Sequence, residues 1–167
     1  FTAASIKDLL RRFLSEGHEI KDLKDLVAIQ LNDTHPAIAG PELVRILVDE
    51  HGLELVEAID MARDCLGYTN HTLLPEALET WPEELVARIL PRHYRLIELI
   101  QEHHFATSGS GIRIIEHGSV KIGDLALIMQ QQAHGVSARH TALVQEAGYT
   151  DHNKTYHQRS QNPPNGT

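Results

Sequence analysis

The sequence has one cysteine, few aromatic side chains and no long apolar run. A single cysteine in 167 residues excludes an internal disulfide framework. Cys65 lies in an apolar pattern with Leu55, Ile59, Ala62 and Leu66, which predicts a buried structural thiol. Charged residues interrupt every apolar stretch well before the ~18 residues of a membrane helix, and no basic segment leads into an apolar one near the N-terminus. We therefore expect a cytoplasmic protein with no membrane partner.

The sequence also lacks an excess of positive charge and a recognisable metal or phosphate motif. The formal net charge is −8, and the basic residues are scattered, so we expect no nucleic-acid partner. Twelve histidines include no His-Glu-x-x-His pair, and Asp33, His35 and His71 are a weakly patterned candidate ligand set. We expect no metal. Gly109-Ser110-Gly111 lacks the Lys-Ser/Thr that completes a phosphate-binding loop.

What the sequence does contain is typical of a globular α/β domain. Hydrophobic residues make up 41% and charged residues 23%, enough for a sizeable core. Short apolar runs alternate with helical periodicity, which predicts parallel strands flanked by helices. Gly67 is expected to end a helix, and Pro91 to kink or split one. The predicted segments are a strand at 27–31, helices at 5–13, 41–52 and 53–66, a helix that begins at Pro75 or Pro82 and continues to Ile100, and a further candidate helix at 136–144.

Both ends of the sequence suggest an excerpt from a longer protein. The chain begins at Phe1 in a segment that reads like the inside of a helix, without an initiator methionine. Residues 151–167 contain no aliphatic side chain and end in a Pro-Pro-Asn-Gly turn signal, which predicts a polar loop or tail. We expect residues 1–167 to be one partial domain.

Two polar clusters are built alike. Asn32-Asp33-Thr34-His35 follows the predicted strand, Thr69-Asn70-His71-Thr72 follows a second apolar stretch, and a proline closes each cluster. In parallel sheets ligands bind at the carboxyl ends of strands, so two such edges suggest one pocket in which carboxylate and imidazole groups bind sugar hydroxyls. The alternative is that these residues cap turns and helices, because Asn, Asp and Thr satisfy exposed backbone amides. The spacing alone leaves both interpretations open.

The residues from about Val27 to Ile100 closely resemble the glycogen and α-glucan phosphorylases. In order, they contain VAIQLNDTHP, PEL, YTNHT, LPEALE, WP and LPRH, which are segments typical of that family. The first 13 residues and the stretch from Leu125 to Val144 are similar to it too, and Asn165-Gly166 resembles the start of another family motif. One departure is Gly40, where the family usually has an aliphatic residue before PEL.

The resemblance implies part of a glycosyltransferase B type, Rossmann-like N-terminal domain, helix-rich with a few parallel strands. The parent enzyme would transfer a glucosyl unit from an α-1,4-glucan to inorganic phosphate, giving glucose 1-phosphate, with pyridoxal phosphate as cofactor. The catalytic residue would be His71, bonded to the glucosyl 6-hydroxyl with its backbone carbonyl near the anomeric carbon. The resemblance implies substrate-binding roles for Asp33, His35, Thr72, Glu79 and Asn165, and backbone contacts from Gly135 and Val136.

The same resemblance implies that this chain is incomplete as an enzyme. The cofactor lysine and the phosphate-binding basic residues belong to the family's second domain, which no segment here resembles. We therefore expect the isolated chain to be inactive, and to assemble with the remainder of the phosphorylase chain or as a homo-oligomer. Two alternatives stay open: a non-catalytic module that binds glucan or a protein, and an unrelated α/β hydrolase or metal enzyme that shares short motifs.

Overall fold

The computed structural model describes residues 1–71, 79–130, 132–135 and 160–161. The described chain is helix-rich, and its strands form two small sheets. No described helix is both long enough and apolar enough to cross a membrane. The helices are α1 (Thr2–Ser15), η1 (Ile20–Asp22), α2 (Leu23–Leu26), α3 (Ala39–Arg45), η2 (Ile46–Glu50), α4 (Leu55–Cys65), α5 (Glu83–Ile89), α6 (Pro91–Ser108) and α7 (Ile122–Ile128).

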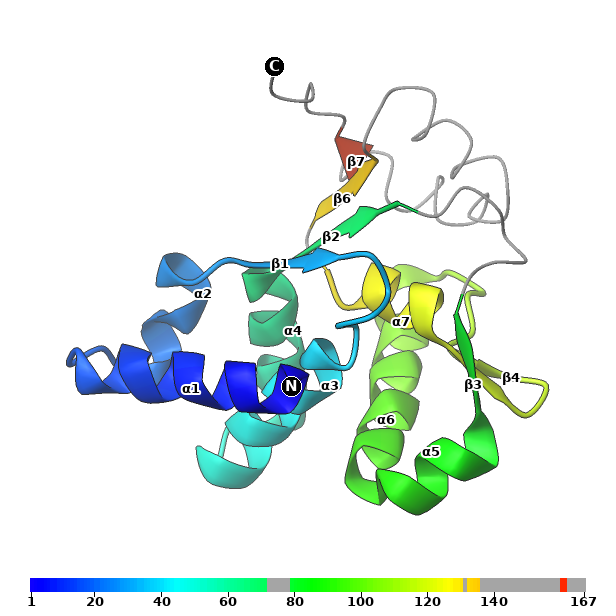
Figure 1. The fold of residues 1–167 in the computed structure, drawn as a ribbon, viewed down its shortest axis with the longest axis horizontal. Helices are drawn as coiled ribbons and strands as arrows, with labels where there is room; N and C mark the ends of the chain where they lie inside the picture. The colour runs from blue at the N-terminus through cyan, green and yellow to red at the C-terminus, as the bar shows by residue number, and fades with distance from the viewer. Residues whose placement is uncertain (72–78, 131, 136–159, 162–167) are drawn as a thin grey trace.

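The first sheet is parallel, as the sequence predicts. Its strand order is β1-β2-β6-β7, and all three neighbouring pairs run in the same direction (Figure 1). Helices α1 to α4 lie below this sheet in the view of Figure 1. The fold is therefore an α/β arrangement with a small parallel sheet. Its strands are β1 (Ile29–Asn32), β2 (Leu66–Asn70), β6 (Gln132–Gly135) and β7 (Ser160–Gln161).

The second sheet was not predicted. It is antiparallel, in the order β3-β5-β4, and consists of β3 (Thr80–Pro82), β4 (Ile115–Glu116) and β5 (Ser119–Lys121). Strands of two or three residues are too short to show alternation in a sequence. The sheet lies beside α5 and α6 (Figure 1).

Most helix predictions are confirmed, and their ends have local causes. α1 ends before Gly17, whose φ of 90° is readily adopted only by glycine. Gly52, with φ 71°, ends the α3–η2 segment in the same way. Pro91 splits the predicted long helix, because α5 stops at Ile89 and α6 starts at the proline. α6 extends to Ser108, into the expected flexible turn, before Gly109 ends it.

Two predictions about the first sheet are corrected. Gly67 does not break the chain between elements, because it lies inside β2 and is paired with Gln30 on one side and Gln132 on the other. A Cβ atom on Gly67 would lie 2.6 Å from the side-chain oxygen of Gln30, so the glycine accommodates a neighbouring side chain. The first strand starts at Ile29, two residues later than expected. The candidate helix at 136–144 lies outside the described residues, as does most of 151–167.

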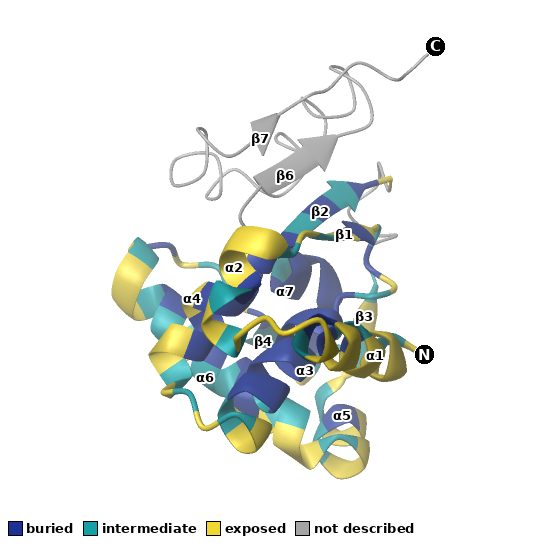
Figure 2. Ribbon diagram, turned by 90° about the vertical axis from the view of Figure 1, so that its left-hand side faces the viewer, coloured by how far each residue is buried: buried dark blue, intermediate teal, exposed yellow. Residues whose placement is uncertain are grey.

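The core lies between the helices and the underside of the first sheet (Figure 2). Cys65 is part of it, and burial raises the pKa of its thiol to about 12, which confirms a structural rather than a reactive cysteine. The largest fully buried side chains come from residues throughout the described helices and the first sheet, and from the segment before β4. They are Tyr68, Leu23, Leu31, Leu43, Ile46, Leu47, Ile59, Leu66, Leu96, Ile97, Ile100 and Ile114.

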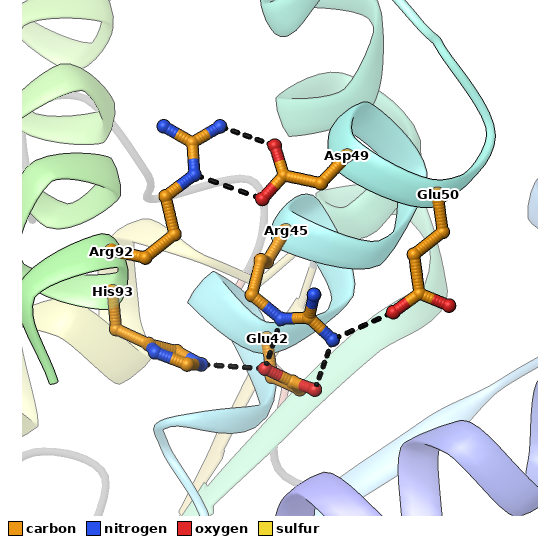
Figure 3. A network of polar contacts seen from close by, with 6 residues as sticks. All are labelled: Glu42, Arg45, Asp49, Glu50, Arg92 and His93. Carbon is orange, nitrogen blue, oxygen red and sulfur yellow. Dashed lines mark hydrogen bonds and ion pairs between the residues drawn. The ribbon is translucent and has the colours of Figure 1, made fainter.

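A polar network joins α3 and η2 to α6 (Figure 3). The buried carboxylate of Glu42 accepts hydrogen bonds from Arg45 at 2.9 Å and from His93 at 2.5 Å. Arg92 of α6, the residue before His93, donates a hydrogen bond to Asp49 of η2. Burial alone would raise the pKa of Glu42, but hydrogen bonds from Arg45 and His93 outweigh it and hold that pKa below its ordinary value.

Candidate functional site

The two polar clusters meet at one edge of the parallel sheet. β1 and β2 pair in register, with Asn32 opposite Thr69 at their carboxyl ends. The backbone N–H of Asp33 continues this pairing by donating to the carbonyl of Thr69 at 2.8 Å. His71 follows one residue after β2 and is exposed at the same edge. The expectation that the two clusters lie together is confirmed.

The backbone turns sharply at Asp33. Its φ of 62° is in the left-handed region, which costs most non-glycine residues roughly 1–2 kcal/mol. Aspartate tolerates this conformation because its short side chain bonds the local backbone, and Oδ1 of Asp33 accepts from the N–H of Thr34 at 2.9 Å. Strained backbone of this kind is concentrated at functional sites.

The capping interpretation describes only part of this cluster, since Asp33 satisfies the backbone N–H of Thr34 but no residue of the cluster caps α3. α3 begins after Ile38, and no side chain caps it. The hydroxyl of Thr34, which could have capped a turn, instead donates to Oε2 of Glu79 at 3.0 Å. The first cluster is therefore joined to a residue 45 positions further along the chain.

Glu79 links the cluster to the second sheet. Its Oε1 accepts a hydrogen bond from the indole Nε1 of Trp81 at 2.8 Å, and its Oε2 lies 3.8 Å from Nδ1 of His35. The backbone of Glu79 is fixed as well, because its carbonyl accepts from the N–H of Ile122 at 3.0 Å just before β3 begins. One polar group thus lies at the carboxyl-terminal edge of the parallel sheet, and it consists of Asp33, Thr34, His35 and Glu79.

The end of β2 is rigid beneath the exposed His71. The buried amide of Asn70 donates to the hydroxyl of Tyr68 at 2.9 Å, and Thr69 accepts from Gln30 of the neighbouring strand at 2.8 Å. Gly135, whose backbone was expected near the sugar, pairs with Asn70 at the end of β6. His71 therefore extends from a fixed edge made by three parallel strands.

Several predicted residues cannot be placed. Thr72, Val136 and Asn165 lie outside the described residues. Sequence reasoning named Thr34 only as a member of the first polar cluster, and it missed Trp81, which the structure brings into the group. The available signal was the Glu79-x-Trp81 spacing, because residues two apart in an extended segment lie on one face.

The electrostatics of the edge are acidic. Burial raises the pKa of the Tyr68 hydroxyl, and the nearby carboxylates of Asp33 and Asp124 raise it further. Burial also raises the pKa of Asp124 to about 6. The carboxylates of Asp33 and Glu79 offer several acceptor positions to the hydroxyl groups of a ligand.

The part of the chain that the structure describes offers no metal or pyridoxal phosphate site. No group of three His, Cys, Asp or Glu side chains there could hold a metal ion. A pyridoxal group requires a lysine that can form a Schiff base within a pocket. Of the described lysines, Lys7, Lys21 and Lys24 are exposed, and Lys121 is paired with Glu116. These residues do not fit the cofactor.

Comparison with known proteins identifies the class to which this fold and edge belong. The profile of the carbohydrate phosphorylase family matches residues 1–167. The chain belongs to that family.

Among curated relatives, the chain is similar to the glycogen phosphorylases. It is 41% identical to the glycogen phosphorylase of Haemophilus influenzae and 37% identical to that of Pasteurella multocida. It is 36% identical to the brain form of human glycogen phosphorylase. Each match covers 98% of this chain and 22% of the relative, so the chain spans about a fifth of their length.

Proposed function

We propose that this chain forms the glucosyl-binding wall of an α-glucan phosphorylase. The complete enzyme would transfer a glucosyl unit from an α-1,4-glucan to inorganic phosphate and release glucose 1-phosphate. One observation carries the proposal: Asp33, His35 and Glu79 lie together beside the edge from which His71 extends. The names of the relatives, all glycogen phosphorylases, support the same activity.

The proposed wall binds and orients the sugar. His71 hydrogen-bonds the glucosyl 6-hydroxyl and brings its backbone carbonyl near the anomeric carbon, where positive charge develops as the glycosidic bond breaks. Asp33 and Glu79 accept hydrogen bonds from other hydroxyls, and Thr72 and Asn165 complete the contacts. Fixed dipoles and carboxylates at such positions stabilise a cation-like transition state without reorganising.

The remainder of the active site would come from elsewhere in the complete enzyme. We assign this chain to the N-terminal domain of a glycosyltransferase B type fold, a two-domain arrangement with the catalytic cleft between the domains. The family resemblance implies that pyridoxal phosphate and the inorganic phosphate would be held by the second domain. The isolated chain would be inactive, and its partners would be the rest of the enzyme and a second copy, in the cytoplasm.

A second candidate is a binding module without catalysis. It is favoured by the polar group at Thr34, His35 and Glu79, which can bind hydroxyl groups without a cofactor. Titration of the 167-residue chain with maltoheptaose, followed by NMR, distinguishes the two. Saturable shifts in a chain that shows no phosphorolysis in any assembled form would favour the binding module.

The test of the proposal is a hybrid enzyme, in which this chain replaces the matching segment of the Haemophilus influenzae glycogen phosphorylase. We expect it to phosphorolyse glycogen, and His71→Ala to lower kcat/KM by about a hundredfold or more, as loss of a preorganised transition-state contact does. Tyr94→Phe, which removes a hydrogen bond to Glu83 away from the edge, is the control and should change little. A folded hybrid that is inactive, or equally active with and without His71, would contradict the proposal.

A further inference from the structure

We infer that Trp81 and Thr34 are positioning residues for Glu79: together they hold both of its carboxylate oxygens and so fix where this group meets the sugar and His35. The inference rests on the proposed function for its ligand. It concerns Trp81, for which the sequence suggested no role, and Thr34, which the sequence placed only in a polar cluster. Neither side chain needs to touch the substrate.

Trp81 fixes one oxygen from the second sheet. Its indole Nε1 donates to Oε1 of Glu79 at 2.8 Å, a normal length for a hydrogen bond to a carboxylate. The ring is partly buried against the core, and its backbone is paired with Val120 of β5. The donor is therefore held in place by packing and by the strand, not by Glu79 itself.

Thr34 fixes the other oxygen from the first sheet. Its side-chain hydroxyl donates to Oε2 of Glu79 at 3.0 Å, and the residue is only 4% exposed. The turn at Asp33 determines where this hydroxyl points, since the N–H of Thr34 is bonded to Asp33. Glu79 is thus bonded both to Thr34, just after β1, and to Trp81, within β3.

This double attachment matters because the groups beyond it are open to solvent. The side chain of Glu79 is 33% exposed and that of His35 is 82% exposed, so packing alone does not orient them. A glutamate with free torsions loses rotameric entropy when it binds a ligand. Two protein donors remove that loss in advance, and each oxygen keeps acceptor capacity for a hydroxyl or for His35.

The arrangement also gives His35 a defined neighbour. Nδ1 of His35 lies 3.8 Å from Oε2 of Glu79, the oxygen that Thr34 holds. This separation is an ion-pair distance and is too long for a hydrogen bond. Glu79 therefore lies beside His35 without hydrogen bonding to it, and the exposed imidazole stays open to a sugar hydroxyl.

The first test reads the indole directly in the 167-residue chain. Trp81 is the only tryptophan, so its indole N–H gives a single identifiable NMR signal. We expect that signal to exchange slowly with solvent in the parent chain and roughly tenfold or more faster in Glu79→Leu. Tyr94→Phe, which removes a different hydrogen bond to a glutamate, should leave it unchanged. Equal exchange in the parent and in Glu79→Leu would overturn the inference, whatever the chain's activity.

The second test measures kinetics in the hybrid enzyme. Trp81→Phe keeps an aromatic ring but removes the indole N–H, and Thr34→Val keeps the shape and removes the hydroxyl. We expect each to lower kcat/KM by about tenfold, since each removes a hydrogen bond to a charged group. In a Glu79→Leu background neither should have any further effect, because both act through Glu79.

The outcomes separate this inference from the proposed function. If the hybrid depends on His71 but Trp81→Phe is harmless, or is equally harmful with and without Glu79, the positioning role is wrong and the proposed function stands. If the indole signal behaves as expected but the hybrid does not depend on His71, the positioning geometry stands and the proposed function fails. A loss of thermal stability without the kinetic coupling would indicate a purely structural role and overturn the inference.

Discussion

The backbone N–H of Asp33 donates to the carbonyl of Thr69 at 2.8 Å, and this one hydrogen bond joins the two polar clusters of the sequence. It lies one residue beyond the last pair of the β1–β2 ladder. The left-handed turn at Asp33 and the exposed His71 are therefore neighbours in space, although 38 positions separate them in the chain. The candidate sugar edge depends on this junction.

The strain at Asp33 predicts an unusual order of stabilities among its variants. Asp33→Asn keeps both the tolerance for positive φ and the acceptor for the Thr34 N–H, so unfolding free energy should change by less than about 0.5 kcal/mol. Asp33→Val should cost about 2 kcal/mol or more, because it loses that bond and places a β-branched residue in the left-handed region. Urea unfolding of the chain measures both. A valine variant as stable as the asparagine variant would show that the turn is not strained.

Gly40 explains one departure from the family pattern and predicts a sign reversal. A Cβ on Gly40 would lie 2.9 Å from Cγ of Met129, which is fully buried. Gly40→Ala should therefore destabilise the chain by about 1 kcal/mol, since overpacking exceeds the gain in helix propensity. In a Met129→Gly background, which removes Cβ at 3.0 Å as well as Cγ and Cε, the same change should stabilise it by up to about 1 kcal/mol. Thermal or urea unfolding of the parent, the two single variants and the double variant gives the double-mutant cycle. Additive effects on the free energy of unfolding would contradict this packing account.

The network at Glu42 predicts a loss of stability in acid. Because its pKa is held below the ordinary value of 4.5, the ionised form stabilises the fold; this contribution is complete above that value and disappears as the pH falls through the lowered pKa. Glu42→Gln should cost about 3 kcal/mol at pH 7, as breaking a buried pair does.

The control for this prediction shares the same arginine. Glu50 also bonds Arg45, but it lies at the exposed end of η2, so Glu50→Gln should cost less than about 1 kcal/mol. Unfolding free energies measured from pH 3 to pH 7 should converge for the parent and Glu42→Gln at the acid end. If Glu42→Gln and Glu50→Gln lowered the free energy of unfolding equally, burial of Glu42 would contribute nothing.

Asp124 predicts the opposite dependence on pH. Burial raises the pKa of its carboxyl to about 6, from an ordinary value of 3.8, so the neutral form is the stabilising one. The penalty is absent below the ordinary value and grows as the pH rises through 6, to about 2–3 kcal/mol. Asp124→Asn should therefore match the parent at pH 3.5 and be more stable at pH 7. A constant difference across that range would rule out titration of Asp124.

Local signals were sufficient to predict most of the longer helices and the part of the candidate edge that directly follows β1. Apolar periodicity and terminators such as Gly17 and Pro91 act within a few residues, so the helix ends could be predicted. Asp33 and His35 were predicted because they follow a strand directly. The contact of Glu79 with Thr34 and Trp81 could not be, since it depends on how two sheets approach each other in space.

The wrong or missing predictions concern very short strands and one glycine that lies under a neighbouring side chain. Strands β3, β4 and β5 have two or three residues each; β4 and β5 form a tight hairpin, and β3 pairs with β5 from a distant segment. Gly67 looked like a terminator because glycine usually ends helices, yet its place in β2 reflects the side chain of Gln30 lying over it. In both cases the deciding contact is with a residue far away in the sequence.

The central claim is that His71 and the Asp33–Glu79 group hold a glucosyl unit, and the most direct measurement pairs an enzyme variant with a substrate variant. In the hybrid enzyme, glucan elongation from glucose 1-phosphate is compared with elongation from its 6-deoxy analogue, with and without His71→Ala. The account predicts that removing the 6-hydroxyl lowers kcat/KM by about tenfold or more when His71 is present, and that this penalty disappears in His71→Ala. An equal penalty in both enzymes would contradict it.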